Sequence, residues 1–468
     1  MLPAPAVAAP AVAANEKTLM ESFLKLEHVF GVSKDLVASY TDRPAVDEAM
    51  ANALRQTRQI IVYGSSKQGK TAVVQRHVPE QDRVTVHCSP QTTTEDLYRS
   101  LLRQLGVEIT VDKSSERGRE MGASIGTKFT AMIPIFGKAE AEAKGELKSK
   151  VGDVVRTEMI EFKLSLSQDV GELLLKVNAA NRFFVVENFH YLTPEVQSSF
   201  AFDLRTFEEM GLRFIILGVW REANRLIQYN GDLQDRIAEI PVEPWQTDDF
   251  ARVVAKGEPV LNIKLSQEVR QKVFDQAHGS IAVVQEIIKK ICEKSGILET
   301  HPGNQPYLID DLTVVEEAIQ EKVKEYSSRH VRSLESIAAV SRTRRNSEET
   351  ASLYLPYYTV KVLVYRTYAE LRDGIERNAL RDLIKVDHPT PDNVRTSDLT
   401  QMLLRLSQIQ ANANIVPPLF DYDRGTHRVK IVDSTLYFFI DNCNAQDVMA
   451  EIPHPEPGIE GQQEPLFS

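Results

Sequence analysis

The sequence predicts an α/β protein with a parallel sheet, followed by a helical region and a small third domain. Two observations indicate the sheet. A glycine-rich loop at residues 64–71 follows a short apolar run, Gln59 to Tyr63. Apolar runs then alternate with amphipathic segments as far as residue 246, which is typical of parallel strands joined by helices. Beyond that point the apolar spacing becomes helical and ends in two short apolar runs joined by a turn.

The glycine-rich loop reads Gly-Ser-Ser-Lys-Gln-Gly-Lys-Thr and matches the G-x-x-x-x-G-K-[ST] pattern of a phosphate-binding loop (P-loop). The run before it predicts a buried strand and the residues after it, Thr71 to His77, predict a helix. Backbone N–H groups and the helix N-terminus supply positive potential for a phosphate chain. We expect Lys70 to reach the β- and γ-phosphates of ATP, and the Thr71 hydroxyl to bind Mg²⁺. The candidate nucleotide-binding residues are Gly64, Ser65, Ser66, Lys67, Gln68, Gly69, Lys70 and Thr71.

Length and charge limit the classes of protein. The chain has 468 residues, which predicts two or three domains. Its 55 Lys and Arg against 66 Asp and Glu residues give a net charge of −11, so any contact with DNA has to come from local basic patches. Cys88, Cys292 and Cys443 lie far apart, which argues against a disulfide framework or a zinc site and fits a reducing cytoplasm. No apolar stretch is long and uninterrupted enough to cross a bilayer, so we expect a soluble cytoplasmic protein without a membrane partner.

The residues around the P-loop alternate between helical and extended patterns. Residues 17–57 look helical, with a distinct helix from Ala45 to Leu54. We expect further strands at 83–88, 183–186, 214–217 and 237–241, and helices at 93–105, 170–178 and 194–210. Residues 107–160 break the alternation. The period-2 pattern from Ala139 to Lys144 suits a β-hairpin, whereas Ala, Glu and Lys favour a helix, so the form of this insertion stays open.

From Thr247 the pattern is helical, and no strand is expected before about residue 418. We expect helices at 248–255, 266–277, 281–294 and 311–326. A third unit has three helical stretches and a hairpin over 419–432, an arrangement that resembles a winged helix. The expected parts are a disordered tail at 1–16, a P-loop ATPase core at 17–246, a helical lid at 247–327, a basic linker at 328–357, a winged-helix-like domain at 358–445 and a disordered tail at 446–468.

The strand Phe183 to Val186 ends in Glu187, in the form of the second motif of a nucleotide site. Glu187 stands where an acid usually holds Mg²⁺ through water, although a capped buried strand would have the same pattern. In ATPases of this broad class, the next position usually carries a second acid that polarises the attacking water. This chain has Asn188 there, which cannot act as a general base at neutral pH. Either Glu187 serves both roles, or hydrolysis is slow and the protein is a switch.

Arg236 precedes the last expected strand. An arginine there can stabilise transition-state charge at a γ-phosphate, in the same chain or across a subunit interface. The alternative is a surface arginine paired with Asp232 or Asp235. Arg221, at the end of the fourth strand, is a weaker candidate for a phosphate contact.

The order of P-loop, acid-ended strand, arginine, helical lid and winged helix resembles AAA+ ATPases of the initiator and STAND type. The resemblance covers residues 36–440 apart from the insertion, and it implies ATP and Mg²⁺ as cofactors. Arg43 looks like the arginine of the entry helix that flanks adenine in that group. The chain departs from the group at Asn188 and at residues 278–282, which lack an arginine near the expected lid sensor.

Two functions remain open. The first is an ATP-driven switch or assembly ATPase, in which ATP closes the lid and exposes a surface for a second copy or a protein partner. The resemblance of the chain to bacterial defence or mobile-element ATPases implies a bacterial signalling role for such a switch. The second is a nucleotide-sensing DNA-binding regulator with little or no hydrolysis. The winged helix offers few basic residues to DNA, so a domain that only packs against the ATPase core explains the sequence equally well. The basic residues are Arg381, Lys385, Arg395, Arg405, Arg424, His427, Arg428 and Lys430.

Overall fold

The computed structural model describes residues 23–111, 129–135, 156–177, 179–340 and 353–454. The chain forms two compact units. The sheet unit comprises Pro44–Gly64 and Val73–Val242, and the C-terminal unit comprises Met1–Arg43, Ser65–Ala72 and Glu243–Ser468. The P-loop residues after Gly64 therefore belong to the same unit as the lid.

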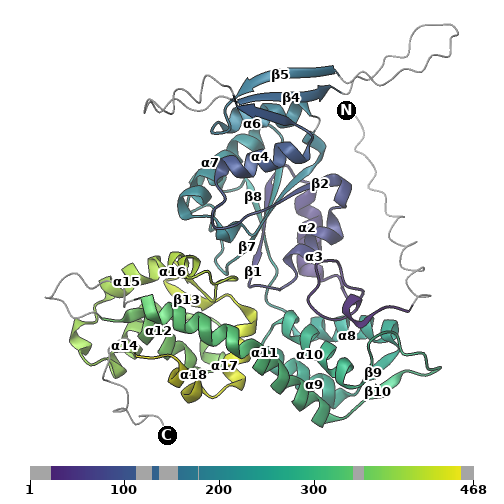
Figure 1. Cartoon of the computed structure of the whole chain (residues 1–468), viewed down its shortest axis with the longest axis vertical. Helices are drawn as coiled ribbons and strands as arrows, with labels where there is room; N and C mark the ends of the chain where they lie inside the picture. The colour runs from purple at the N-terminus through teal and green to yellow at the C-terminus, as the bar shows by residue number, and fades with distance from the viewer. Residues whose placement is uncertain (1–22, 112–128, 136–155, 178, 341–352, 455–468) are drawn as a thin grey trace. The chain divides into compact units, whose positions relative to one another are not determined.

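A five-stranded parallel sheet forms the centre of the sheet unit, in the order β2-β6-β7-β1-β8 (Figure 1). From β1 the chain passes to the far edge at β2, returns through β6 and β7, and then crosses to β8. Strand β1 thus lies where the strand order reverses, which is where parallel sheets bind ligands at the carboxyl ends of their strands. The predicted α/β class with a parallel sheet is confirmed. The strands are β1 (Gln59–Gly64), β2 (Arg83–His87), β6 (Phe183–Glu187), β7 (Arg213–Val219) and β8 (Ile237–Pro241).

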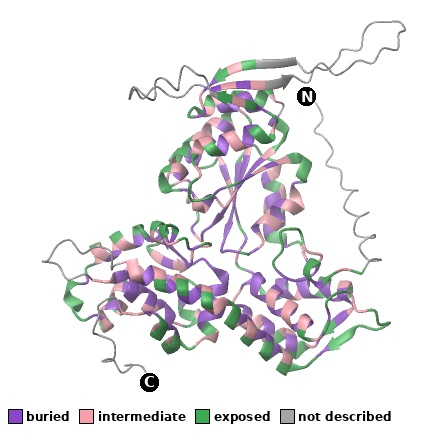
Figure 2. Ribbon diagram, viewed as in Figure 1, coloured by how far each residue is buried: buried purple, intermediate pink, exposed green. Residues whose placement is uncertain are grey.

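Helices cover both faces of this sheet. On one face α2 (Pro44–Leu54) and α3 (Lys70–His77) pack over the side chains of Ile60, Val62 and Ile215. The other face is covered by α4 (Thr94–Gln104), α6 (Ser167–Lys176) and α7 (Pro194–Glu209), whose apolar sides are buried with the sheet. Figure 2 shows the strands as buried between exposed outer helix surfaces. Each fully buried large apolar side chain contributes about 1.5–3 kcal/mol, so the two layers hold the strand ends in place.

The insertion forms a second, antiparallel sheet in the order β3-β4-β5. Its strands are β3 (Glu108–Val111), β4 (Phe129–Ile135) and β5 (Arg156–Phe162). Phe129, Ala131 and Phe162 alternate toward the core beneath α4 and α6, as a half-buried sheet requires. The described part of the insertion is therefore a β-sheet. The alternatives of hairpin and helix concerned Ala139 to Lys144, which lie outside the described residues.

The first part of the C-terminal unit is the lid region. It consists of α8 (Thr247–Leu261), α9 (Gln267–Ala277), α10 (Ile281–Lys294) and the start of α11 (Leu312–Ala338). Two short strands, β9 (Ile263–Leu265) and β10 (Tyr307–Ile309), pair in parallel here. The expectation of no strand before residue 418 is therefore wrong. Strands of three residues are too short to show a period.

The N-terminal segment packs on the lid region and is mostly not helical. Between residues 23 and 43 the only helical element is the 3-10 turn η1 (Leu26–His28), and Lys25 forms an isolated antiparallel β-bridge with Glu299. Phe30 is fully buried against α8, where a Cβ on Gly257 would meet its ring at 2.3 Å. The predicted helical character of 17–57 is thus wrong over this stretch, because Leu26, Val29 and Phe30 are buried by tertiary packing and not by a helix face.

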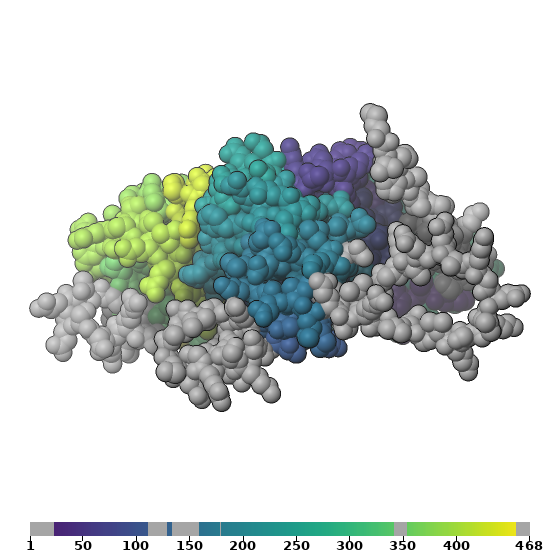
Figure 3. Space-filling view, turned by 90° about the horizontal axis from the view of Figure 1, so that it is seen from above, coloured from purple at the N-terminus to yellow at the C-terminus, as the bar shows by residue number. Residues whose placement is uncertain are grey.

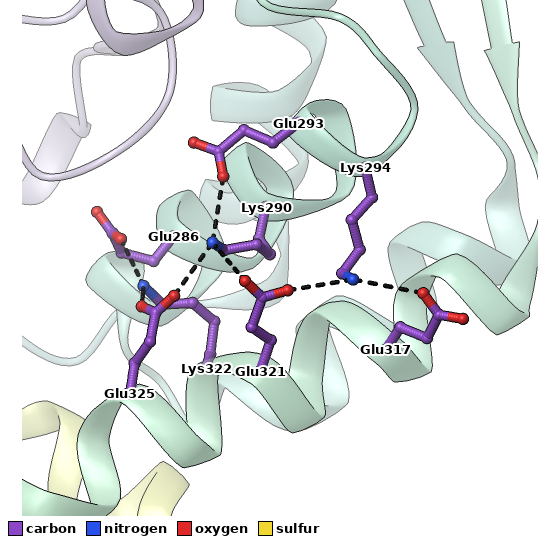
Figure 4. Close-up of polar contacts among 8 residues, drawn as sticks. All are labelled: Glu286, Lys290, Glu293, Lys294, Glu317, Glu321, Lys322 and Glu325. Carbon is purple, nitrogen blue, oxygen red and sulfur yellow. Dashed lines mark hydrogen bonds and ion pairs between the residues drawn. The ribbon is translucent and has the colours of Figure 1, made fainter.

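A single helix, α11, joins the lid to the last region. It has 27 residues and runs through the first part of the segment that the sequence suggested as a linker; residues 341–352 lie outside the described residues. Lysines on α10 and α11 alternate with glutamates along the contact between the two helices (Figure 4). Lys322 lies deepest, with its side chain 8% exposed, 3.0 Å from Glu286 and 2.5 Å from Glu325.

The last region, residues 353–454, combines helices with a three-stranded antiparallel sheet in the order β11-β13-β12. Its helices are α12 (Leu355–Val364), α13 (Tyr368–Leu371), α14 (Arg377–Asp387), α15 (Thr396–Leu404), α16 (Leu406–Asn412), α17 (Ser434–Asn442) and α18 (Ala445–Glu451). The strands are β11 (Ile375–Glu376), β12 (Phe420–Asp423) and β13 (Arg428–Ile431), so the predicted hairpin is present. Figure 3 shows the described residues of this region, in green to yellow, as one continuous body.

Among the described residues, no helix is both long enough and apolar enough to cross a membrane.

The ion pairs of Figure 4 lead to a stability prediction. Burial alone would raise the pKa of Glu286, but the Val32 N–H and the Lys322 ammonium outweigh it and hold that pKa below its ordinary value. Lys322→Met leaves Glu286 buried without its cation, so we expect a loss of about 2 kcal/mol in the free energy of unfolding at pH 7. Urea denaturation measures this loss.

The same experiment has a pH arm and a matched control. The lowered pKa of Glu286 stabilises the folded protein at any pH above the pKa that Glu286 has in the unfolded chain. This stabilisation is lost as the pH falls through the pKa of Glu286 in the folded protein. The difference in unfolding free energy between wild type and Lys322→Met should therefore vanish in acid. Lys294→Met removes a lysine whose partners are largely exposed, and a much smaller loss is expected. Equal losses for the two variants would contradict the argument.

Candidate nucleotide-binding site

The P-loop forms a tight turn between β1 and α3. Strand β1 ends at Gly64 and α3 begins at Lys70. Gly69 has φ +85°, in the left-handed region that favours glycine, and Lys67 has φ 58°. Ser65, Ser66, Gln68 and Lys70 are all buried. The sequence prediction of strand, loop and helix is therefore correct in detail.

Lys70 is held inside the loop. Its ammonium donates to the Ser65 carbonyl at 2.6 Å. The Ser65 N–H and hydroxyl in turn donate to one carboxylate oxygen of Glu243, at 2.9 and 3.0 Å. Glu243 follows β8 in the connection to the lid, and no sequence motif pointed to it. The lysine can therefore exchange its contact with a carbonyl for one with a phosphate without leaving the loop.

The far end of the loop rests on an aromatic side chain. Trp245 Nε1 donates to the Gln68 carbonyl at 3.3 Å, and a Cβ on Gly69 would lie 3.8 Å from the Trp245 ring. The Arg43 guanidinium lies 3.7 Å from the centre of that ring, and Arg43 is 5% exposed. Arg43 thus lies near the P-loop, where the resemblance expected it, while its contact with adenine stays a prediction.

The peptide groups of Ser66 bind the last region of the chain. Its N–H donates to the Val432 carbonyl at 2.9 Å, and its carbonyl accepts from the Ser434 hydroxyl, also at 2.9 Å. Between these two residues Asp433 is fully buried and pairs with Arg329 of α11. Burial would raise the pKa of Asp433, but His330, the Arg329 guanidinium and the Thr435 side chain and N–H hold that pKa below its usual value. Sequence reasoning missed this contact, because residues 66 and 432 are far apart in the chain.

Glu187 ends β6 at the carboxyl edge of the sheet, and one strand, β7, lies between it and the end of β1. His87 Nδ1 lies 3.2 Å from the Glu187 carboxylate, because the last residues of β2 and β6 are in register. Asn188 follows with φ 59°, which a short polar residue tolerates. His87 was not expected, and only the pairing of β2 with β6 reveals it.

Arg236 lies at the opposite edge of the same sheet. It precedes β8, which runs parallel to β1, so the length of the strand, about 15 Å, separates it from the edge where Gly64 and Glu187 lie. Arg236 is ion-paired with Glu208 of α7 and not with Asp232 or Asp235. This placement separates Arg236 from the carboxyl edge of its own sheet, and a role across a subunit interface stays a prediction beside that of a surface ion pair. Arg221 follows β7 at the carboxyl edge.

The residues fit ATP with Mg²⁺. A buried ammonium and hydroxyl lie within a glycine-containing turn, and the Ser66 Oγ is buried without a hydrogen-bond partner among the described residues. Thr71, in the first turn of α3, has a hydroxyl of the kind that Mg²⁺ prefers, since this hard cation takes oxygen ligands and keeps several waters. The role of Glu187 as a second ligand stays a prediction. No separate cluster of three or more His, Cys, Asp or Glu side chains suited to a metal occurs in the described part of the chain.

Comparison with known proteins finds solved structures of low sequence identity and low TM-score. No protein-family model matches the sequence, and no curated protein matches it. Among solved structures, the Walker-type ATPase PABY2304 of Pyrococcus abyssi is 13% identical, with 86% of this chain and 96% of that chain covered and a TM-score of 0.44. The Orc1 protein of Aeropyrum pernix in complex with DNA is 13% identical, covering 92% and 97%, with a TM-score of 0.37. The Holliday junction branch migration motor RuvB of Thermotoga maritima is 8% identical, covering 85% and 93%, with a TM-score of 0.36. At these TM-scores the likenesses carry no argument, and the fold class rests on the strand order and the P-loop.

The first prediction from the site concerns Lys70. Lys70→Ala removes the ammonium that would contact phosphate and should weaken ATP binding by about 1.5–3 kcal/mol without unfolding the protein. Isothermal titration calorimetry measures the affinity. Lys256→Ala removes an exposed lysine on α8 and should leave the affinity unchanged. If Lys70→Ala binds ATP as wild type does, the loop is not a nucleotide site.

The second concerns the end of β6. Glu187→Gln keeps the shape but removes the charge, and it should retain ATP while slowing turnover by about 100-fold or more. Asn188→Asp should raise turnover by supplying a base. Asn224→Asp, at another residue with φ 59°, is the control and should not change it. A phosphate-release assay that finds Glu187→Gln as active as wild type would remove Glu187 from the mechanism.

Proposed function

We propose that the chain is an ATP-binding ATPase of the AAA+ type that works as a nucleotide-dependent switch. The observation that carries this proposal is the pair of hydrogen bonds by which Ser66 of the P-loop binds Val432 and Ser434. A phosphate chain entering the loop reorganises its peptide groups, and the contacts of Ser66 with residues 432–434 change with them. The nucleotide state is thereby coupled to a region that lies more than 350 residues later in the sequence.

Turnover in this proposal is slow. Mg²⁺, held by Thr71 and Glu187, would supply charge neutralisation at the phosphates. Lys70 binds phosphate oxygens, and Glu187 orients or deprotonates a water. The Asn188 amide is neutral and cannot take a proton, so one carboxylate has to serve two roles. A slowly hydrolysing site keeps ATP bound long enough for a second copy or a protein partner to bind the rearranged surface. The role in bacterial signalling remains part of this proposal, on resemblance alone.

The DNA-binding alternative has less support. The proposal includes a winged-helix-like domain at residues 358–445. The order of strand β11, helices α14 to α16 and hairpin β12–β13 supports it. In its hairpin, however, Lys430 is ion-paired with Asp423 at 2.6 Å, and Arg428 donates to the Gly374 carbonyl at 2.7 Å. Of the hairpin residues Arg424, Arg428 and Lys430, the last two are thus engaged within the chain. A module that packs against the P-loop explains these contacts better than a DNA-reading face does.

The switch is tested by weakening the contact with Ser66. Ser434→Ala removes one hydrogen bond, worth about 1 kcal/mol, so half-maximal rearrangement should need about fivefold less ATP. Light scattering and hydrogen exchange, with ATP, with ADP and without nucleotide, report assembly and the exposure of residues 432–442. Ser336→Ala, which loses an exposed hydroxyl contact on α11, is the control. Wild-type protein that binds ATP with no change in mass or exchange would refute the switch and leave a simple nucleotide-binding protein.

A further inference from the structure

We propose that Gln68 is a positioning residue that couples the P-loop directly to lid helix α10, in place of an arginine sensor. This proposal rests on the proposed function, since it names the route by which the nucleotide state reaches the lid. Residues 278–282, at the start of α10, contain no arginine to contact a phosphate. The lid instead contacts a side chain of the P-loop itself.

The Gln68 amide makes two contacts with the start of α10. Its Nε2 donates to the Ser280 hydroxyl at 3.2 Å, and its Oε1 accepts from the Ile281 N–H at 3.3 Å. Gln68 is 1% exposed and Ser280 is 2% exposed, so water does not replace these partners. The first N–H groups of a helix have no partner within it, and here the P-loop supplies one.

The backbone of Gln68 is constrained on both sides. Lys67 and Gly69, its neighbours, have positive φ angles, and the Gln68 carbonyl accepts from Trp245. The side chain points to the lid while the backbone forms the phosphate loop. A change in the peptide groups at residues 67–70 therefore displaces the amide and the first turn of α10 together.

The turn between α9 and α10 also contacts the last region. His278 Nε2 lies 2.9 Å from the Asp441 carboxylate on α17, and the His278 ring lies 4.5 Å from that of Tyr368. Helix α17 begins with Ser434, the residue that binds Ser66. The contacts thus form a closed ring that runs from Gln68 through α10, His278 and α17 back to Ser66. A phosphate at the loop acts on this ring at two points.

The test compares ATP affinity with the response of α10. Gln68→Leu keeps the approximate size and removes both hydrogen bonds. Calorimetry sets the ATP concentration that saturates each protein, and the responses are compared at saturation, so that a change in affinity does not count as a loss of coupling. In wild type, ATP should change the hydrogen exchange of residues 281–285, and in Gln68→Leu this response should be lost. Calorimetry and hydrogen exchange with mass spectrometry supply the two measurements on the full chain.

A pair of serines separates coupling from helix capping. Ser280 caps α10 and contacts Gln68, whereas Ser266 caps α9 in the same way without touching the P-loop. Ser280→Ala should reduce the ATP response of α10, and Ser266→Ala should not. This pair also keeps the proposal testable if Gln68→Leu does not fold.

Three outcomes would overturn the coupling. If Gln68→Leu or Ser280→Ala retains the full ATP response of α10, the amide does not couple. If ATP changes residues 432–442 but not α10 in wild type, the switch stands and the Gln68 route falls. If wild-type protein does not bind ATP, the proposed function and this inference fall together.

Discussion

The need to satisfy buried polar groups in the P-loop organises the C-terminal unit. Ser65, Ser66, Gln68 and Lys70 are buried, and buried polar groups are nearly always hydrogen-bonded. Their partners come from the connection after β8, from the lid and from the last region. The loop cannot change shape without exchanging these partners, each of which is costly to leave unpaired. The proposed nucleotide site and the proposed switch therefore depend on the same hydrogen bonds.

The sequence predicts the sheet unit well because its signals are local. Each strand is a short apolar run, and the P-loop pattern marks the strand that lies at the reversal of strand order. The lid strands β9 and β10 were missed because three residues show no period. The contacts of Ser66 with Val432, and of Glu187 with His87, depend on tertiary pairing, which one sequence does not show. Glu243 was missed for the same reason: a carboxylate after a strand carries no motif.

Topology, and not sequence, decides what Arg236 can do. Its place before the last strand suggested a phosphate contact. In a parallel sheet, the start of one strand and the end of its neighbour lie at opposite edges. Arg236 precedes β8 and Gly64 ends the neighbouring strand β1, so Arg236 lies at the edge away from Gly64. Its pairing with Glu208 keeps the guanidinium at the outer edge of the sheet unit.

Helix α11 has a mechanical consequence. Its N-terminal half is part of the lid core through Val315, Ala318 and Ile319, and its C-terminal half is part of the last core through Leu334 and Ile337. One unbroken helix of 27 residues, about 40 Å long, thus acts as a lever between the two. Because a helix is stiff along its axis, a rotation of about one-tenth of a radian at the lid would displace its far end by about 4 Å. In the proposed switch, a small rotation of the lid region would thus move the last region by about the length of a side chain.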